Sequence, residues 1–153
     1  MTSEKTYSLT SSSEKADLDR LMFEWANQFP NIPDNVLLIK YEYFASKTVG
    51  MALSSVQGAV ITKKYITGGY QAEYSFEIHY QIAPPLASDD KRLKAVEVLN
   101  QFADWAQSQR PAIGEDRRAI QIEATAFASY LGVTDDQYED YYVPLKLTYE
   151  VNV

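Results

Sequence analysis

His79 is the single histidine of the chain, and imidazole is the side chain whose ordinary pKa lies closest to neutrality. If its surroundings form a strand, Glu77 and Gln81 share its face, and Glu73 lies further along. A histidine beside a carboxylate could polarise a water molecule, but a solvated sheet face also explains this grouping. The chain has no cysteine and no G-x-S-x-G motif that would activate a serine. We therefore expect no catalytic residues and no cofactor.

The densest group of carboxylates lies near the C-terminus and comprises Asp135, Asp136, Glu139 and Asp140. Hard cations such as Ca²⁺ need several convergent oxygen ligands, and this stretch lacks the spacing and central glycine of an EF-hand loop. Zinc–thiolate sites are excluded because cysteine is absent. We expect no metal site, and interpret the cluster as a solvated turn or an acidic loop that faces a partner.

The charge balance argues against nucleic acid as a partner. The 153 residues include 14 Lys and Arg against 21 Asp and Glu, a net charge of −7, whereas phosphate binding requires basic surface. The glycine-rich phosphate-binding motifs are also missing. No apolar run approaches the roughly 18 residues of a membrane span. We expect neither sequence-specific nucleic-acid binding nor membrane insertion.

Tyrosine dominates the aromatic residues, with 12 Tyr against 6 Phe and 2 Trp. Tyrosine is favoured on half-buried sheet faces and at protein interfaces, where the ring is dry and the hydroxyl finds a partner. The composition is therefore typical of a β-rich domain or of a protein that contacts other proteins.

Two amphipathic helices are predicted, over Glu14–Phe29 and Ser88–Gln109. Ser11 and Glu14 fit a capping box before the first helix, and Ser88 is placed to cap the second. The apolar positions recur at helical spacing and predict the buried faces. They are Leu18, Leu21, Met22, Trp25 and Phe29 in the first helix, and Leu93, Val96, Leu99, Phe102, Ala103 and Ala106 in the second.

The clearest strand pattern follows the turn Thr67–Gly69, where glycine permits a hairpin. From Tyr70 to Ile82, apolar and polar residues alternate strictly, which predicts one dry face and one wet face. Val143–Val153 alternates in the same way. Further strands are predicted over Val36–Phe44, Met51–Val56, Gly58–Ile66 and Ile120–Leu131.

The order of these elements predicts an α+β domain, since strands come in runs and do not alternate with helices. We expect an antiparallel or mixed sheet of five to six strands with both helices on one face. Residues 1–13 are predicted to be a flexible N-terminus, and residues 14–153 a single domain. The other sheet face carries Glu73, Glu77, His79, Lys146 and Glu150, and must meet water or another subunit.

Three segments resemble the minor capsid and tail-terminator proteins of long-tailed bacteriophages. They are TGGYQAEYSFEIHYQI with the helix KRLKAVEVLNQFADWA, AIQIEATAFASYLGVTDD, and the terminal strand YYVPLKLTYEV. The resemblance implies a small α+β fold that assembles as a ring, typically a hexamer. Such a ring caps the tail tube and joins it to head-completion proteins. It also implies a virion protein of the head–tail joint, made in the host bacterial cytoplasm.

Two alternatives remain open. One is another neck or minor capsid connector, which the sequence does not separate from a terminator. The other is a helix-plus-sheet domain that binds a small ligand in a pocket lined by His79, Glu73 and tyrosines. Against this second reading, the aromatic and polar positions of the best strand alternate onto opposite faces.

We expect subunits to associate through sheet edges, the polar face and the loops at the ends of the sheet. The hairpin Thr67, Gly68 and Gly69 is one predicted partner-binding segment. The turn Thr134–Tyr142 is the other, because it combines carboxylates with tyrosines. Tyr141 belongs to the core face by parity, so the residues singled out in this turn are Asp135, Asp136, Tyr138 and Tyr142.

Overall fold

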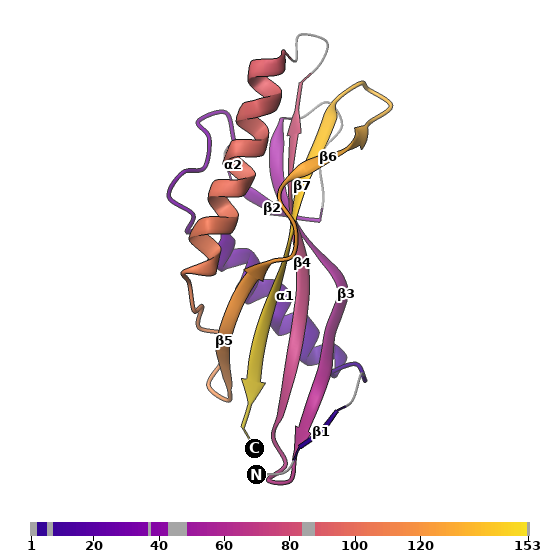
Figure 1. Cartoon of the computed structure of the whole chain (residues 1–153), viewed down its shortest axis with the longest axis vertical. Helices are drawn as coiled ribbons and strands as arrows, with labels where there is room; N and C mark the ends of the chain where they lie inside the picture. The colour runs from indigo at the N-terminus through magenta and orange to yellow at the C-terminus, as the bar shows by residue number, and fades with distance from the viewer. Residues whose placement is uncertain (1–2, 6–7, 37, 43–48, 84–87, 153) are drawn as a thin grey trace.

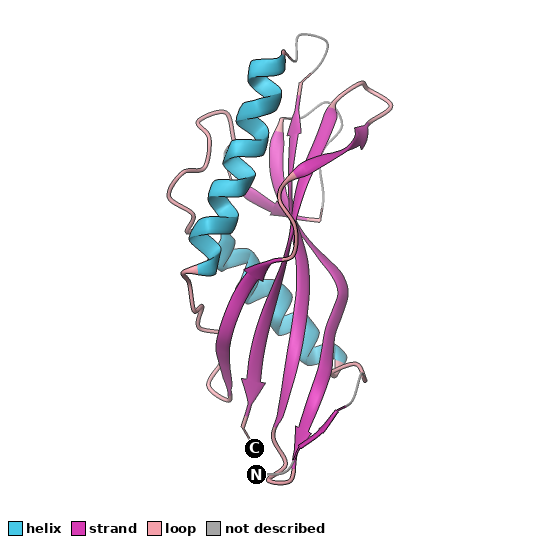
Figure 2. Ribbon diagram, viewed as in Figure 1, coloured by secondary structure: helices cyan, strands magenta, loops and turns pink. Residues whose placement is uncertain are grey.

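A computed structural model describes residues 3–5, 8–36, 38–42, 49–83 and 88–152 of the chain. These residues form two helices and one seven-stranded mixed sheet, which confirms the α+β class (Figures 1 and 2). The elements are β1 (Ser3–Lys5), α1 (Ser12–Ala26), β2 (Ile39–Tyr41), β3 (Gly50–Tyr65), β4 (Tyr70–Ile82), α2 (Asp89–Gln107), β5 (Arg117–Ala124), β6 (Ser129–Val133) and β7 (Glu139–Val151).

The sheet has the order β1-β3-β4-β7-β5, with β2 also paired to β3 and β6 also paired to β7. All pairs are antiparallel except β2 with β3. The strand count exceeds the expected five to six because β1 was not predicted and one predicted strand is divided into β5 and β6, although two other predicted strands merge into β3. Strand β1 lies within the segment that was predicted to be flexible, and pairs with the end of β3.

Both helices are capped by the predicted serines, but α1 begins at Ser12 rather than Glu14, and the helices end at Ala26 and Gln107 rather than at Phe29 and Gln109. The side chain of Ser11 accepts a hydrogen bond from the backbone N–H of Glu14 at 3.2 Å, and Ser88 accepts one from Lys91 at 3.3 Å. Only half of the predicted capping box forms. The Glu14 carboxylate instead accepts hydrogen bonds from the hydroxyls of Tyr70 and Tyr149 on the sheet.

The helices cover the same sheet face with the apolar stripes that their spacing predicts. The buried residues are Leu18, Met22, Trp25 and Ala26 in α1, and Ala95, Leu99, Phe102, Ala103 and Ala106 in α2. Leu93 is the exception, since 61% of it is exposed. It lies six positions before Leu99, about 120° around the helix, and so falls outside the stripe. Ala95 is buried there instead.

An aromatic cluster joins the two helices beneath the sheet. Trp25 of α1 stacks on Trp105 of α2 with ring centroids 5.0 Å apart, and packs edge-on against Phe102 and against Phe76 of β4. Each such pair adds about 0.5–1.5 kcal/mol beyond the burial of its area. The cluster therefore fixes α1 and α2 to each other and to the centre of the sheet.

Strands β4 and β7 form the centre of the sheet and confirm the predicted alternation. They pair in unbroken register from Tyr70 opposite Val151 to Ile82 opposite Glu139. Their helix-facing side chains are buried, and the polar side chains between them lie on the other face. The buried set is Ala72, Tyr74, Phe76, Ile78, Tyr80 and Ile82 in β4, and Tyr141, Val143, Leu145, Leu147, Tyr149 and Val151 in β7.

Five of the six predicted strands have different bounds in the structure, including the last, since β7 begins at Glu139 rather than at Val143. Met51–Val56 and Gly58–Ile66 are one strand, β3, interrupted by a bulge in which Gly58 adopts φ +70°. Positive φ favours glycine, so Gly58, which was predicted to begin the second strand, lies in the bulge of a single strand. Among the described residues of the predicted strand Val36–Phe44, the short strand β2 is the only strand, and residues 37, 43 and 44 lie outside the described part of the chain.

The predicted strand Ile120–Leu131 is divided into β5 and β6. The interruption is held by α2, since Gln107 Oε1 accepts a hydrogen bond from the Ala124 N–H and Asn100 Oδ1 accepts one from the Ala128 N–H. These side chains replace the lost strand partners of the backbone. The chain can therefore leave the regular ladder and return to β7 as β6.

Candidate functional site

The first predicted partner segment is the tight turn between β3 and β4. The Gly68 N–H donates to the Tyr65 carbonyl at 3.0 Å, and Gly68 adopts φ +100°. Thr67 and Gly68 are exposed at the tip. Gly69 is buried and lies so close to Val151 that a Cβ at this position would collide with the Val151 carbonyl oxygen. Thr67 and Gly68 are accessible to a partner, whereas Gly69 allows the hairpin to approach the end of β7.

The second predicted segment closes the hairpin between β6 and β7. The Thr134 N–H donates to the Tyr138 carbonyl at 2.8 Å, and the Tyr138 N–H donates to the Thr134 hydroxyl oxygen at 3.1 Å. Gln137 adopts φ +68°, which is unusual for a residue other than glycine. Asp135 is exposed, while Asp136 and Tyr138 are half-buried.

The two predicted segments lie at opposite ends of the sheet (Figure 2). Tyr70, beside the first turn, faces Val151, and Ile82 faces Glu139, close to the second turn. Twelve residue steps along a strand span roughly 40 Å. The sequence predicted both turns but not their separation, and a single small partner could not contact both.

Tyr142 lies on the polar sheet face rather than at the tip of its turn. It is opposite His79 in the register, and the two rings stack with centroids 5.9 Å apart. His79 Nε2 is 3.0 Å from Glu77 Oε1, and its Nδ1 is 3.3 Å from Asp140 Oδ1. The sequence indicated Glu77 as a neighbour of His79. Asp140 and Tyr142 belong to β7, and only the pairing register of β4 with β7 places them beside His79.

The electrostatics of His79 are those of a charge-paired histidine. Burial by itself lowers the pKa of the imidazole, but hydrogen bonds and charge from Asp140 and Glu77 outweigh it and raise the pKa above its ordinary value. Both ring nitrogens face carboxylates, which the doubly protonated ring satisfies best. In this geometry neither nitrogen is free to take a proton from a substrate.

A second ionic group lies further along the same face. Lys146 of β7 contacts Glu73 of β4 at 3.2 Å and Glu123 of β5 at 3.3 Å. The hydrogen bond to Glu73 contributes most to raising the pKa of Lys146, against the opposing effect of burial. The face predicted to meet water or a subunit therefore carries charges that are already paired within the chain.

The largest exposed apolar side chains near the second turn were not predicted as site residues. They are Leu93 of α2, Phe127 before β6, and Tyr130, Leu131 and Val133 of β6. A sequence signal exists, because the run from Ala124 to Thr134 contains no charge. Most of this uncharged run falls in the predicted strand Ile120–Leu131, in which apolar residues are expected to be buried.

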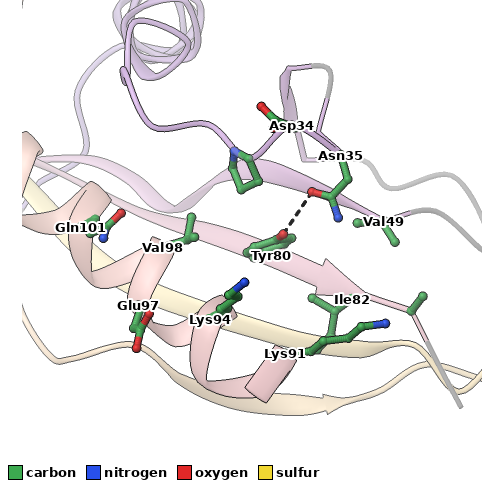
Figure 3. A pocket seen from close by; sticks show the side chains of 12 residues that line it. Asp34, Asn35, Val49, Tyr80, Ile82, Lys91, Lys94, Glu97, Val98 and Gln101 are labelled. Carbon is green, nitrogen blue, oxygen red and sulfur yellow. Dashed lines mark hydrogen bonds between the residues drawn. The ribbon is translucent and has the colours of Figure 1, made fainter. Parts of the chain in front are cut away.

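A pocket of about 540 Å³ opens on the helix side of the sheet (Figure 3). Tyr80 and Ile82 contribute from β4, and Lys91 and Lys94 contribute from the first turns of α2. The Tyr80 hydroxyl donates to Asn35 Oδ1 at 3.4 Å. His79 and Glu73 do not line this pocket because they belong to the opposite sheet face. The pocket therefore lacks two of the residues that the ligand-binding alternative assigned to it.

The described residues contain no group of three or more histidine or acidic side chains arranged to hold a metal ion. Among these residues, no helix is long and apolar enough to cross a membrane. No protein-family model matches the chain, and no curated protein matches its sequence. The fold, the charge distribution and the exposed surfaces are therefore the features that indicate a function.

Proposed function

We propose that the chain is a non-enzymatic virion structural protein, similar to the tail terminators of long-tailed bacteriophages. In this role it forms a ring that caps the tail tube and joins it to head-completion proteins. The hairpin containing Thr67 and Gly68 serves one contact, and the turn containing Asp135, Asp136, Tyr138 and Tyr142 serves another.

One observation carries the proposal: the two accessible turns lie at opposite ends of the continuous β4–β7 pair. A protein that joins two assemblies needs separate contact regions held at a fixed distance, and a rigid antiparallel pair provides this spacing. The charge of −7 also suits a ring around a DNA channel, since like charge opposes adhesion of passing DNA. The same reasoning fits another neck connector.

A small-ligand-binding role is the second candidate, and the pocket beside Tyr80 favours it. Its volume of about 540 Å³ lies within the range of ligand sites, and its floor of Tyr80, Ile82 and Val98 is apolar. Lys91 and Lys94 at its rim are accompanied by Asp34 and Glu97, so the rim offers no single charge to select a ligand. We rank this role below the structural one.

The test is assembly of virions that carry Tyr138→Ala together with Tyr142→Ala. We expect uncapped tails of irregular length and few tails joined to heads, as counted by electron microscopy. Tyr138→Phe with Tyr142→Phe is the matched control, because it keeps both rings and should assemble normally. Circular dichroism must first show that both variants fold. Normal tails with the alanine variant would exclude this turn as an assembly surface.

Virions produced without the chain test the proposed function directly. If virions without the chain have normal tails joined to heads, the proposed structural role is wrong. If purified chain instead binds small molecules that protect it against thermal unfolding, and Tyr80→Ala abolishes the protection, the ligand-binding role is favoured.

A further inference from the structure

The pocket beside Tyr80 lies between one face of α2 and the loop that follows α1, with the end of β4 as its floor (Figure 3). Tyr80 and Ile82 are the floor residues of β4, and each is only 6% exposed. Val98 of α2 adds a further apolar side chain to the lining. The apolar part of a ligand that occupied this space would therefore leave water, which favours binding.

The two lysines of the pocket are available to a ligand. Lys91 and Lys94 contact no carboxylate among the described residues, whereas Nε of Arg92, on the same helix, lies 2.9 Å from Glu139 Oε1. An ammonium group beside apolar surface interacts strongly with an anion, because the effective dielectric constant there is lower than that of water. The pocket therefore offers two cationic groups that the chain itself does not neutralise.

Helix geometry directs these lysines, but not the neighbouring Glu97, toward the pocket. Lys91 lies one turn before Ala95, which is buried against the sheet. Lys94 lies one turn before Val98, which lines the pocket. Glu97 is two positions after Ala95, about 160° around the helix from this buried residue, and so lies on the solvent side of α2.

The other acidic residue of the rim is also directed outward. Figure 3 shows the Asp34 carboxylate pointing away from Tyr80, whereas the ammonium group of Lys94 points toward Tyr80. The rim contains both signs of charge, but the charged groups directed inward are cationic.

Asn35 supplies a neutral donor on the wall opposite the lysines. The Tyr80 hydroxyl donates to Asn35 Oδ1 at 3.4 Å, and burial raises the pKa of Tyr80, so the hydroxyl keeps its proton. Asn35 Nδ2 has no acceptor among the described residues and is directed toward Ile82 in Figure 3. An anionic oxygen in the pocket can therefore accept hydrogen bonds from both walls.

We propose that this pocket binds a small carboxylic acid with an apolar body, either an aromatic ring or a short alkyl chain. The carboxylate lies between Lys94 and Asn35, with Lys91 as a second cation, and the apolar body covers Tyr80 and Ile82. One negative charge shared by two oxygens suits this small set of donors. None of the described lining residues is an arginine or a glycine, the residues that commonly hold phosphate.

Calorimetric titration of the purified chain with matched probes tests the chemical class. Phenylpropanoate, phenylpropanol and phenylpropylamine share one apolar body and differ in their polar group. We expect the acid to bind about tenfold more tightly than the alcohol, because hydrogen bonds to a charged group are the stronger ones, and the amine not to bind. Octanoate should also bind, whereas inorganic phosphate should not. Equal affinities for the three phenyl probes, or no binding by either acid, would overturn the proposal.

Lysine variants test the position of the site. Lys94→Met and Lys91→Met remove an exposed ammonium group and keep an apolar stem, so both should fold. We expect Lys94→Met to weaken acid binding about tenfold, Lys91→Met to weaken it less, and neither to change alcohol binding.

Lys64→Met is the matched control. Lys64 is exposed and pairs with Tyr70, at the far end of β4 from the pocket, and its loss changes the net charge by the same amount. Its affinity for the acid should equal that of the unaltered chain. Equal losses in the control and the pocket variants, or unchanged affinity in both pocket variants, would overturn the proposed site.

A pocket of this kind goes beyond the proposed virion role and does not depend on it. The titrations use the purified chain, whereas the virion role is tested by the tails of particles produced without the chain. A chain that binds no acid but is needed for joined tails would refute the pocket alone. A chain that binds the acid and is dispensable for tails would refute the virion role alone.

Discussion

The hydroxyl of Tyr149 donates a 2.6 Å hydrogen bond to Glu14 Oε2, although 135 positions separate the two residues along the chain. Tyr70 donates to the other oxygen of the same carboxylate. Asp19, one turn further along α1, accepts a 2.6 Å hydrogen bond from Tyr74. These bonds hold the N-terminal half of α1 to strands β4 and β7. Burial, with the hydrogen bond to each carboxylate, raises the pKa of Tyr70, Tyr74 and Tyr149.

Tyr149→Phe should destabilise the fold by about 1.5–3 kcal/mol, because it removes a buried hydrogen bond to a carboxylate. The measurement is the free energy of unfolding in urea. Tyr65→Phe is the matched control, since its hydroxyl bonds Glu150 at 3.2 Å on a less buried part of the sheet. We expect it to cost about 1 kcal/mol or less. Equal losses would show that the Tyr149–Glu14 bond has no special weight.

Leu99→Ala should lower the free energy of unfolding by about 2–5 kcal/mol, because Leu99 is fully buried beneath the sheet. Leu93→Ala lies on the same helix and removes the same atoms, but Leu93 is largely exposed. Its cost should stay within about 0.5 kcal/mol. Thermal unfolding of both variants gives the comparison, and near-wild-type stability of Leu99→Ala would contradict the assigned core.

Gly69→Ala should destabilise the chain by about 1–3 kcal/mol, since the added methyl group collides with the Val151 carbonyl and the backbone must shift. Gly132→Ala adds the same group where nothing lies within 4 Å and should be nearly neutral. Chemical unfolding at low protein concentration measures both without a contribution from self-association. A neutral Gly69→Ala would mean that the hairpin does not approach β7 as described.

His79 should stabilise the fold more in mildly acidic than in alkaline solution. Because its pKa is raised in the folded state, its contribution is fully present below the ordinary value of 6.5 and is lost as the pH rises through the folded value. The deficit of His79→Gln relative to the unaltered chain should therefore be larger at about pH 6 than at about pH 8.5. Urea unfolding at the two pH values measures it.

Gln71→Ala, on the same face of β4, is the control and should show no such pH dependence.

The His79→Gln variant should also retain tail capping, because the proposed role needs no general base. Loss of capping in a folded and assembled His79→Gln variant would contradict the non-enzymatic proposal. A deficit that grows with pH would contradict the assigned ion pairs.

The sequence by itself determined the local structure. Alternation with period two fixed which side chains of β4 and β7 are buried, because successive side chains of a strand point to opposite faces. Serines at Ser11 and Ser88 fixed the helix starts, since their oxygens satisfy backbone donors within the same turn. The α+β class followed from the order of these elements.

Only the tertiary structure decided how distant segments meet. The Glu14 carboxylate does not complete the predicted capping box, because it accepts hydrogen bonds from Tyr70 and Tyr149 of the sheet instead. The strand register placed Asp140 and Tyr142 beside His79, and Asn100 and Gln107 of α2 separated β5 from β6. Each outcome depends on contacts between residues far apart in the sequence, which local propensity does not encode. Strand β6 is the clearest case. Its apolar residues are typical of a buried strand, but in the described part of the chain β6 pairs with β7 alone, and its apolar side chains are exposed.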